Sequence, residues 1–402
     1  MLKKIIVPIL VLVVLLTGCS SFAENETTDG ITTVDTTEAE NENTEFFKGA
    51  WISYFELHRS GRTEEEYRQY LEELFLNASQ VGITDIFLHV RASGEAVYTS
   101  ALFPPAEYIC EEEEDLPFDV LRMSLDTAKK YSMNIHAWIN PYRAYSVKKA
   151  ESVPVCKMKN WIETESSNMK KVGERYFFNP SSSEVRALIT DGVREILTEY
   201  PEVKGIHIDD YFYPENCGDF DSQEYSDYIS QGGTLSLYDW RRENVNSLVS
   251  GIYAAVKSFG EDKIFSVSPS GDIEKNYNTL YADVELWSGV RGYCDMIMPQ
   301  IYFGFENEKL PFVPTLERWC SLTENSEVKL VVGLALYKCG QEDIYAGEKG
   351  KDEWINNTDI IKRQVECIKD RKIDGFSLYS TSFINFSESF LSQEMNNLKS
   401  VL

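Results

Sequence analysis

The chain has 402 residues, of which 43% are hydrophobic and 13% aromatic, and its formal charge at pH 7 is −26. A chain of this length and apolar fraction can bury a large core, which excludes a wholly disordered or fibrous protein. The excess of Asp and Glu argues against a nucleic-acid partner, because phosphate binding needs clustered Lys and Arg.

The chain begins with the features of a bacterial export signal. Lys3 and Lys4 precede an uninterrupted apolar run over 5–16, too short to span a membrane but typical of a signal peptide. The run ends in Leu-Thr-Gly followed by Cys19, which resembles the lipobox of bacterial lipoproteins. We therefore expect residues 1–18 to be removed, and Cys19 to carry the acyl chains that anchor the protein to the outer side of the membrane. The alternative is an ordinary secretory signal in which Cys19 has no role.

Residues 19–45 are expected to form a linker behind the lipidated cysteine. The segment 20–45 contains eight Asp or Glu and no Lys or Arg. Such a segment cannot bury enough apolar surface to fold, so we predict a disordered acidic tether. Residues 46–402 then form the folded catalytic domain.

From residue 46 onward, short apolar runs alternate with longer amphipathic segments. Eight runs have the composition of buried strands, and they cover 49–55, 85–91, 134–140, 205–211, 263–268, 295–302, 329–336 and 373–379. Between them lie helical patterns, and the segments 63–66 and 181–184 are typical of capping boxes. Alternating strands and helices imply parallel pairing, so eight such units predict a single (β/α)8 TIM barrel of the α/β class.

Three of the segments that follow strands are unusually long. They cover 141–180 after the third strand, 212–235 after the fourth and 337–357 after the seventh. The loops that follow strands build the active face of such a barrel, so their length predicts a walled cleft. The alternative is that they are insertions without a role in the site.

Alternation within the strands also sorts polar side chains. In the second, third and fourth strands it directs His89, His136 and His207 toward the barrel axis, with Arg91 and Asp209 following on the same face. The chain has no His-x-His strand motif and no His-x-x-x-His helix motif, so the signal for a metal site is weak. We interpret the histidines as neutral, hydrogen-bonded core residues and expect no metal and no cofactor, with a metal site as the alternative.

The fourth strand ends in the most informative stretch, HIDDYFYP over 207–214. Asp209 and Asp210 are adjacent carboxylates at the carboxyl end of a strand, and their mutual repulsion can leave one protonated near neutral pH. Hydrolysis of a glycosidic bond needs such a general acid, with a second carboxylate as base, nucleophile or orienting group. The alternative is structural, with Asp210 capping the next loop and Asp209 paired with Arg91 or a histidine.

Six segments, in this order, resemble the motifs of the bacterial glycosyl-hydrolase-like family 10. They are GAWI (49–52), RASGEAVY (91–98), HAWINPYR (136–143), HIDDYFYP (207–214), SVSP (266–269) and MPQIY (298–302). The resemblance covers nearly all of 46–402 and implies a secreted or lipid-anchored barrel similar to glycoside hydrolases, some of which act on peptidoglycan. It implies glycosidic hydrolysis, with Asp209 and Asp210 at the family's acid pair. Glu95 stands where members commonly carry Asp and is kept among the substrate-binding candidates.

Aromatic and polar residues at the strand ends agree with a sugar ligand. Aromatic rings can stack on pyranose faces, and polar groups can bind hydroxyl, N-acetyl or carboxylate groups. The aromatic candidates are Trp138, Tyr142, Tyr211, Tyr213, Tyr302 and Tyr337. The polar candidates are Arg91, Asn140, Arg143 and Gln300. For any single aromatic residue, core packing is the alternative.

The arrangement of carboxylates narrows the mechanism. The familiar pair of glutamates after the fourth and seventh strands is missing, because the first carboxylate beyond the seventh strand is Glu342. A fourth-strand acid with a nearby tyrosine instead resembles chitinase-type barrels, in which the substrate's N-acetyl group attacks and an aspartate orients it. We expect Asp210 to donate the proton and Asp209 to orient or stabilise, and the roles can be exchanged.

The predicted function is hydrolysis of a polysaccharide of the cell envelope, with peptidoglycan-type N-acetylated glycan strands as the favoured substrate. Two other functions compete with it. A carbohydrate-binding lipoprotein without activity would need the aromatic cleft but not the acid pair. A carbohydrate deacetylase also uses paired aspartates, but it needs a metal and paired histidines.

Overall fold

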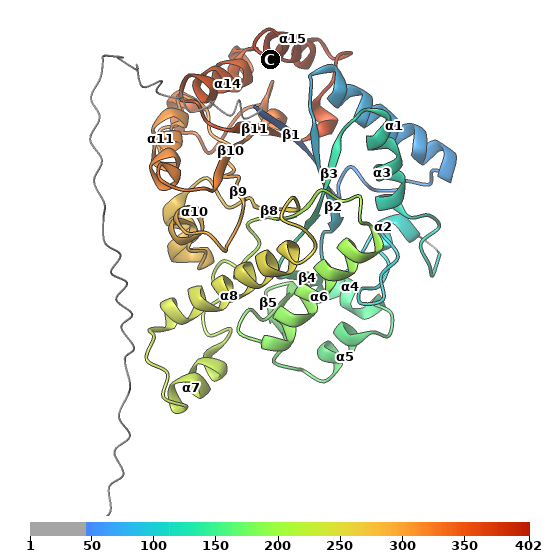
Figure 1. Ribbon diagram of the computed structural model, residues 1–402, viewed down its shortest axis with the longest axis vertical. Coiled ribbons are helices and arrows are strands. Elements are labelled where there is room, and N and C mark those ends of the chain that lie inside the picture. Colours follow the sequence, from blue (N-terminus) through green and yellow to red (C-terminus); the bar gives the residue numbers. More distant parts are fainter. Residues whose placement is uncertain (1–45, 112) are drawn as a thin grey trace, which may run out of the picture. The chain divides into compact units, whose positions relative to one another are not determined.

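The computed structural model describes residues 46–402 except residue 112. The signal, the lipidation site and the linker predicted for residues 1–45 lie outside the described residues. Eight parallel strands close into a barrel in the order β1-β11-β10-β9-β8-β7-β3-β2, so each strand pairs with its neighbours along the chain (Figure 1). The strands are β1 (Phe47–Ile52), β2 (Asp85–Arg91), β3 (Asn134–Ile139), β7 (Gly205–Ile208), β8 (Ile264–Val267), β9 (Met296–Ile297), β10 (Lys329–Leu334) and β11 (Gly375–Tyr379). Each overlaps one predicted run, which confirms the predicted TIM barrel.

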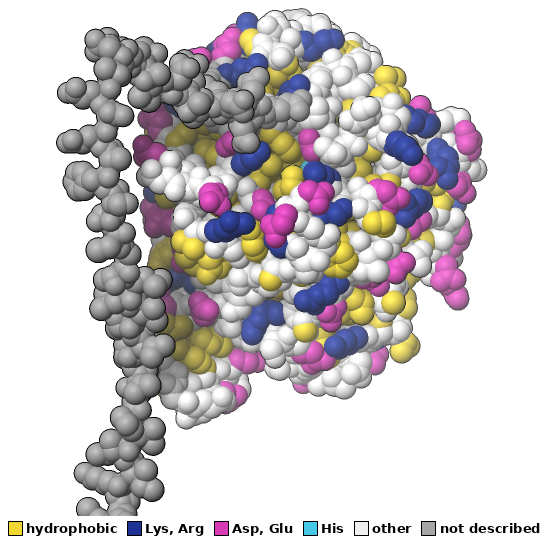
Figure 2. Space-filling view, viewed as in Figure 1, with side chains coloured by type: hydrophobic (Ala, Val, Ile, Leu, Met, Phe, Trp, Pro, Cys, Tyr) yellow, Lys and Arg dark blue, Asp and Glu magenta, His cyan; other side chains and the backbone are white. Residues whose placement is uncertain are grey.

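A ring of helices surrounds the barrel (Figure 1). The longer ones are α1 (Glu64–Gln80), α3 (Val120–Lys130), α6 (Ser183–Glu199), α8 (Leu237–Lys257), α11 (Phe312–Thr323), α14 (Ile360–Asp370) and α15 (Ser389–Lys399). A shorter helix, α10 (Val284–Gly289), lies between β8 and β9 in the chain. Within the described part of the chain, no helix is both long enough and apolar enough to cross a membrane. On the face seen in Figure 2, acidic and basic side chains are interspersed.

Helix starts follow the predicted capping signals in part. Thr63 caps α1, and the Glu66 carboxylate accepts from the Thr63 backbone N–H at 2.9 Å, which completes a capping box. At α6 the cap is Ser182, whose side chain accepts from the backbone of Val185. With Ser182 as the cap, Glu184 is the second helical residue and not the third, so no capping box forms, and its carboxylate accepts a hydrogen bond from Asn168 at 2.7 Å.

Two apolar layers hold the barrel together. Trp51, Phe87, Trp138, Met296, Met298 and Val331 form a cluster inside it. The alternate residues of the same strands, such as Ile86, Ile135 and Ile206, belong to the larger layer shared with the helices. The strict alternation along the strands therefore sorts the side chains as predicted, because successive side chains of a strand point to opposite faces.

The alternation fails at one predicted position. The register between β2 and β3 shifts after His89, so Arg91 lies beside Ile139 instead of continuing the inward series. The Arg91 guanidinium is buried over the ring of Phe103, 4.9 Å from its centroid. A β-bulge inserts one residue and redirects the side chains beyond it, which strict alternation does not anticipate.

The long loops carry secondary structure of their own. The loop after β3 holds α4 (Val147–Ser152), α5 (Lys157–Glu163) and a small sheet of β4 (Arg143–Ser146), β5 (Met169–Val172) and β6 (Arg175–Phe178), in the order β4-β6-β5. The loop after β7 contains α7 (Ser222–Ser230), and the loop after β10 contains η2 (Leu336–Lys338), α12 (Gly347–Gly350) and α13 (Glu353–Asn356). The remaining short elements are α2 (Glu107–Cys110), α9 (Ile273–Lys275), η1 (Asn276–Leu280) and η3 (Thr381–Phe383).

A buried ion pair fixes the loop after β7. Arg241 of α8 donates from Nε to Asp221 Oδ1 at 3.0 Å, and its Nη1 donates to the Tyr281 hydroxyl at 2.9 Å. Both charged side chains are almost fully buried. The pair therefore connects this loop to the segment after β8, which contains Tyr281.

Candidate functional site

A cleft opens at the carboxyl ends of the barrel strands, and we call it the central cleft. It has a volume of about 290 Å³. Every barrel strand except β2 contributes to its wall, either directly or through the residues that follow the strand. Its lining residues are Trp51, Trp138, Asp209, Asp210, Tyr211, Ser268, Gln300, Tyr302, Tyr337 and Tyr379. The site thus lies where active sites of such barrels are found.

Asp209 directly follows β7 and is held by donors on both carboxylate oxygens. Its Oδ2 accepts from Trp138 Nε1 at 2.8 Å and also from the side-chain amide of Asn140. Its Oδ1 accepts from the backbone N–H of Tyr211 at 3.3 Å. Only 2% of the residue is exposed. Asp209 is therefore a fixed carboxyl group at the floor of the cleft.

Asp210 is the more accessible of the two carboxyl groups. It is partly exposed and lines the central cleft together with Gln300. Burial raises the pKa of Asp210 above its ordinary value, while Lys275 and the Gln300 side chain lower it in part. The group that faces the open cleft is therefore Asp210, with Asp209 behind it.

The environment keeps a proton on this pair near neutral pH. Burial and the adjacent Asp210 carboxylate together raise the pKa of Asp209 to about 7, although Arg143 and the Trp138 N–H lower it in part. Because the two groups are neighbours, the proton belongs to the pair. A carboxyl group that is still protonated near pH 7 can act as a general acid.

Three tyrosines form one wall of the central cleft. Ring centroids are 5.9 Å apart for Tyr302 and Tyr337, 5.8 Å for Tyr302 and Tyr379, and 5.9 Å for Tyr337 and Tyr379. Trp51 extends this wall, with its ring 6.1 Å from that of Tyr379. Aromatic faces of this kind are suited to the apolar faces of sugar rings.

A second cavity of about 380 Å³ adjoins the central cleft, and we call it the side cavity. Asp210 and Tyr211 line both. The other residues of the side cavity are Arg143, Arg175, Phe177, Phe212, Tyr213, Pro214, Glu215, Lys275 and Leu280. Its walls come from the loops after β3, β7 and β8, so two of the three long segments that follow strands border it, and the third contributes Tyr337 to the central cleft.

The structure thus brings nine predicted residues to the two cavities. Asp209, Asp210, Trp138, Tyr211, Gln300, Tyr302 and Tyr337 line the central cleft, and Arg143 and Tyr213 line the side cavity. Asn140 and Arg91 line neither. Asn140 instead donates to Asp209, and its carbonyl accepts from Arg91 Nη2 at 2.6 Å. These two residues lie beneath the acid pair and support it.

Two further predicted residues also lie outside the cavities. Tyr142 is fully buried, and its backbone N–H donates to the Tyr211 carbonyl at 3.3 Å. Glu95 is buried and pairs with Lys149 at 2.9 Å. Burial raises the pKa of Glu95, and Lys149 lowers it in part. The pair joins the loop after β2 to α4, and Glu95 lines neither cavity.

The sequence interpretation missed several lining residues. Trp51, Ser268 and Tyr379 stand at or just beyond the carboxyl ends of β1, β8 and β11, so the rule that located Asp209 could have found them. Arg175 lies 36 residues beyond the end of β3, and Lys275 lies eight residues beyond the end of β8, past the strand-end positions themselves. Only the folding of the loops brings them to a cavity that Asp210 also lines.

Of the three inward histidines, two make the hydrogen bonds expected of core residues. His136 Nε2 lies 2.9 Å from Asp85 Oδ1, and His207 Nδ1 lies 2.8 Å from Ser266 Oγ. Neither ring nitrogen of His89 has a partner among the described residues. Burial lowers the pKa of His89 and of His207 well below the ordinary value, so both rings are neutral. The described residues include no group of three or more His, Cys, Asp or Glu arranged to hold a metal ion.

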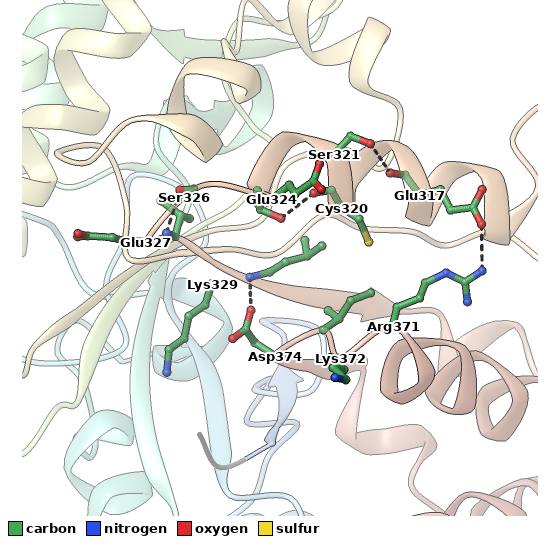
Figure 3. Close-up of a pocket in the computed structure, with 14 residues that line it drawn as sticks. Glu317, Cys320, Ser321, Glu324, Ser326, Glu327, Lys329, Arg371, Lys372 and Asp374 are labelled. Atoms are coloured by element: carbon green, nitrogen blue, oxygen red, sulfur yellow. Dashed lines mark hydrogen bonds and ion pairs between the residues drawn. The ribbon is translucent and has the colours of Figure 1, made fainter. Parts of the chain in front are cut away.

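A larger cavity lies at the other end of the barrel, beside the amino ends of β10 and β11 (Figure 3). Its volume is about 750 Å³. Arg371 and Glu317 form an ion pair of 3.0 Å across it, and Asp374 accepts from the backbone of Leu330 at 2.9 Å. These contacts connect α11, β10 and the turn after α14, and residues at this face of a barrel serve stability.

Comparison with known proteins finds relatives in sequence and a similar barrel among solved structures. Glycosyl hydrolase DigH of Escherichia coli is 28% identical over 341 residues, which cover 76% of this chain and 74% of DigH. Glycosyl hydrolase YngK of Bacillus subtilis is 27% identical over 334 residues, which cover 77% of this chain and 63% of YngK. The endo-1,4-β-mannanase of Rhizomucor miehei matches with a TM-score of 0.53 at 9% identity, over 88% of this chain and 94% of the mannanase. This last likeness shows the barrel fold alone.

The match to a protein family spans most of the barrel. Residues 46–349 fit the family described as Glycosyl hydrolase-like 10. That span contains the first seven barrel strands, the acid pair after β7 and both arginines of the side cavity. The strand-end motifs had predicted the same family. The chain therefore belongs to the glycosyl hydrolase-like 10 family.

Proposed function

We propose that the protein is a glycoside hydrolase that cleaves N-acetylated glycan strands of the peptidoglycan type. The observation that carries this proposal is the acid pair in the central cleft, where Asp210 faces the open volume and Asp209 is fixed behind it. Family membership and the aromatic wall support a carbohydrate substrate. The choice of an N-acetylated strand rests on the likeness of the fourth-strand acid and its tyrosine to chitinase-type barrels.

The proposed reaction begins with proton transfer. Asp210 donates its proton to the glycosidic oxygen, and the bond from that oxygen to the anomeric carbon breaks. The acetamido oxygen of the same sugar attacks the anomeric carbon, and Asp209 holds the acetamido N–H in line for the attack. Water then opens the cyclic intermediate and returns a proton to Asp210.

Isosteric variants test the two roles. In Asp210→Asn the side chain cannot donate a proton, and Asp209→Asn removes the charge that orients the acetamido group. Each is expected to lower kcat about 10²–10⁴-fold. The assay measures new reducing ends on purified glycan strands stripped of their peptides, with Asp191→Asn on the outer face of α6 as the matched control.

Three outcomes of this assay separate the competing functions. Release of reducing ends that persists with a chelator, and is lost in both cleft variants, supports the hydrolase. Binding without cleavage in the unmodified protein indicates a carbohydrate-binding protein. Release of acetate that a chelator abolishes indicates a deacetylase. Full cleavage in both variants contradicts the proposed mechanism.

A further inference from the structure

The side cavity carries an arrangement of charge that the proposed reaction does not use. Arg143 and Arg175 both line it, and burial together with the charge of Arg143 lowers the pKa of Arg175. In the part of the chain that the structure describes, neither guanidinium forms an ion pair with a carboxylate. Their hydrogen bonds go to main-chain oxygens, from Arg143 to Ala92 and from Arg175 to Ala144.

The two arginines lie in a strongly acidic chain. The formal charge is −26, so carboxylates outnumber cations and partners for two arginines are plentiful. The third cation of the cavity, Lys275, does pair with a carboxylate, that of Glu215 at 2.6 Å. Two neighbouring guanidinium groups that make no direct ion pair repel each other, and an anion bound between or beside them lowers that cost.

Packing holds one of these arginines at the junction of the two cavities. The Arg143 guanidinium lies 4.1 Å from the centre of the Tyr211 ring, and only 8% of Arg143 is exposed. Tyr211 and Asp210 line both cavities. A sugar strand that passes Asp210 can therefore continue over Tyr211 toward the two arginines. The side cavity, at about 380 Å³, has the size of a small-ligand site.

We infer that the side cavity is a subsite for a sugar that bears a carboxylate, located next to the sugar whose bond is cleaved. The guanidinium groups of Arg143 and Arg175 bind the carboxylate, because their planar donors match its two oxygens. This inference rests on the proposed function, and it adds that one sugar of the substrate carries a negative charge. The carboxylate comes from a lactyl ether on an amino sugar or from a uronic acid, and both share this chemistry.

The test compares two substrates that differ only in this carboxylate. Peptide-free glycan strands with free lactyl carboxylates are compared with the same strands after reduction of the carboxylates to alcohols. The unmodified protein is expected to show a KM about tenfold higher on the reduced strands, because a hydrogen-bonded charge pair is lost. A ratio of KM values near one overturns the subsite.

A variant of Arg175 tests whether the preference for carboxylated strands arises in the side cavity. Arg175→Gln is expected to raise KM on carboxylated strands about tenfold and to bring the ratio between the two substrates close to one. Lys171→Gln is the matched control, since Lys171 is an exposed cation of β5 in the same small sheet and lines neither cavity. Arg175→Lys, which keeps the charge, should restore part of the preference. An equal rise of KM on both substrates in Arg175→Gln overturns the assignment.

Binding measurements separate this inference from the proposed reaction. Calorimetry with oligosaccharides of both kinds needs no turnover, and a tenfold preference for the carboxylated form supports the subsite even where no strand is cut. Cleavage of both strands with equal KM supports the hydrolase and overturns the subsite. Competition by an oligouronate distinguishes the sources, because tighter binding of the oligouronate than of the lactyl strand assigns a uronic acid.

Discussion

The ionisation of Asp209 is decided by groups within a few ångströms of its carboxyl oxygens. Burial and the neighbouring Asp210 favour the protonated form, whereas the donors from Trp138 and Tyr211 favour the carboxylate. The balance places the pKa of Asp209 at about 7. The pair therefore loses its last proton near neutral pH, and we expect kcat/KM to fall as the pH rises above about 7.

Trp138→Phe tests this balance at a single hydrogen bond. The variant keeps an aromatic ring but removes the N–H that donates to Asp209 Oδ2 at 2.8 Å. Loss of a donor to the carboxylate raises the pKa of Asp209, so the alkaline limb of kcat/KM should move up by about one pH unit or less. Trp287→Phe is the matched control, because the Trp287 N–H donates to Asn246 Oδ1 outside the cleft. A limb that stays in place or moves down contradicts the prediction.

At the scale of elements, the amino end of α14 is capped by a side chain of α15. The residue before α14, Asp359, makes no side-chain cap bond. Instead Glu394 of α15, which is fully buried, accepts from the backbone N–H of Ile361 at 2.7 Å. Burial raises the pKa of Glu394 to about 7, although the backbone donors lower it in part. The contact between α14 and α15 therefore includes a titrating group.

Glu394 makes stability depend on pH in a definite direction. Because its folded pKa of about 7 lies above the ordinary 4.5, its contribution is complete below about pH 4.5 and is lost as the pH rises through about 7. Glu394→Gln cannot ionise. Relative to the unmodified protein, the free energy of unfolding of this variant should rise by about 2 kcal/mol between pH 5 and pH 8. Urea denaturation at both pH values measures it.

A control keeps this measurement specific. Glu285→Gln changes an exposed residue of α10 in the same chemical way and should show no such trend. If the difference between Glu394→Gln and the unmodified protein does not change with pH, Glu394 is not the titrating group.

At the scale of the whole molecule, the sequence predicts different roles for the barrel and for the preceding 45 residues. The apolar run over 5–16 and Cys19 remain the basis for predicting a lipoprotein, and the acidic segment 20–45 remains a predicted tether. We propose that acylation of Cys19 holds the barrel at the outer side of the membrane, next to the cell-wall glycan. This location suits an enzyme that acts on an insoluble strand.

Cys19→Ser tests this localisation. A serine cannot take the thioether-linked lipid, so most of the protein should move from the membrane to the soluble fraction, since stable anchoring depends on the acyl chains. Cell fractionation followed by mass spectrometry of the amino terminus measures the change. Cys156→Ser, which alters a free cysteine of the barrel, should stay with the membrane. An unchanged distribution of the Cys19 variant contradicts lipid anchoring.

The sequence by itself determined the barrel, its strands and the position of the acid pair. Strand alternation and helix spacing are local patterns, and in a parallel barrel every strand ends at the same face, so a residue such as Asp209 could be located without coordinates. The bulge after His89 was not visible in this way, because it depends on how β2 meets β3. The tertiary structure alone decided that Arg175 and Lys275 line a cavity with Asp210, and that Glu95 lines neither cavity. Those contacts come from loops whose paths depend on packing with distant segments, and no local pattern encodes such packing.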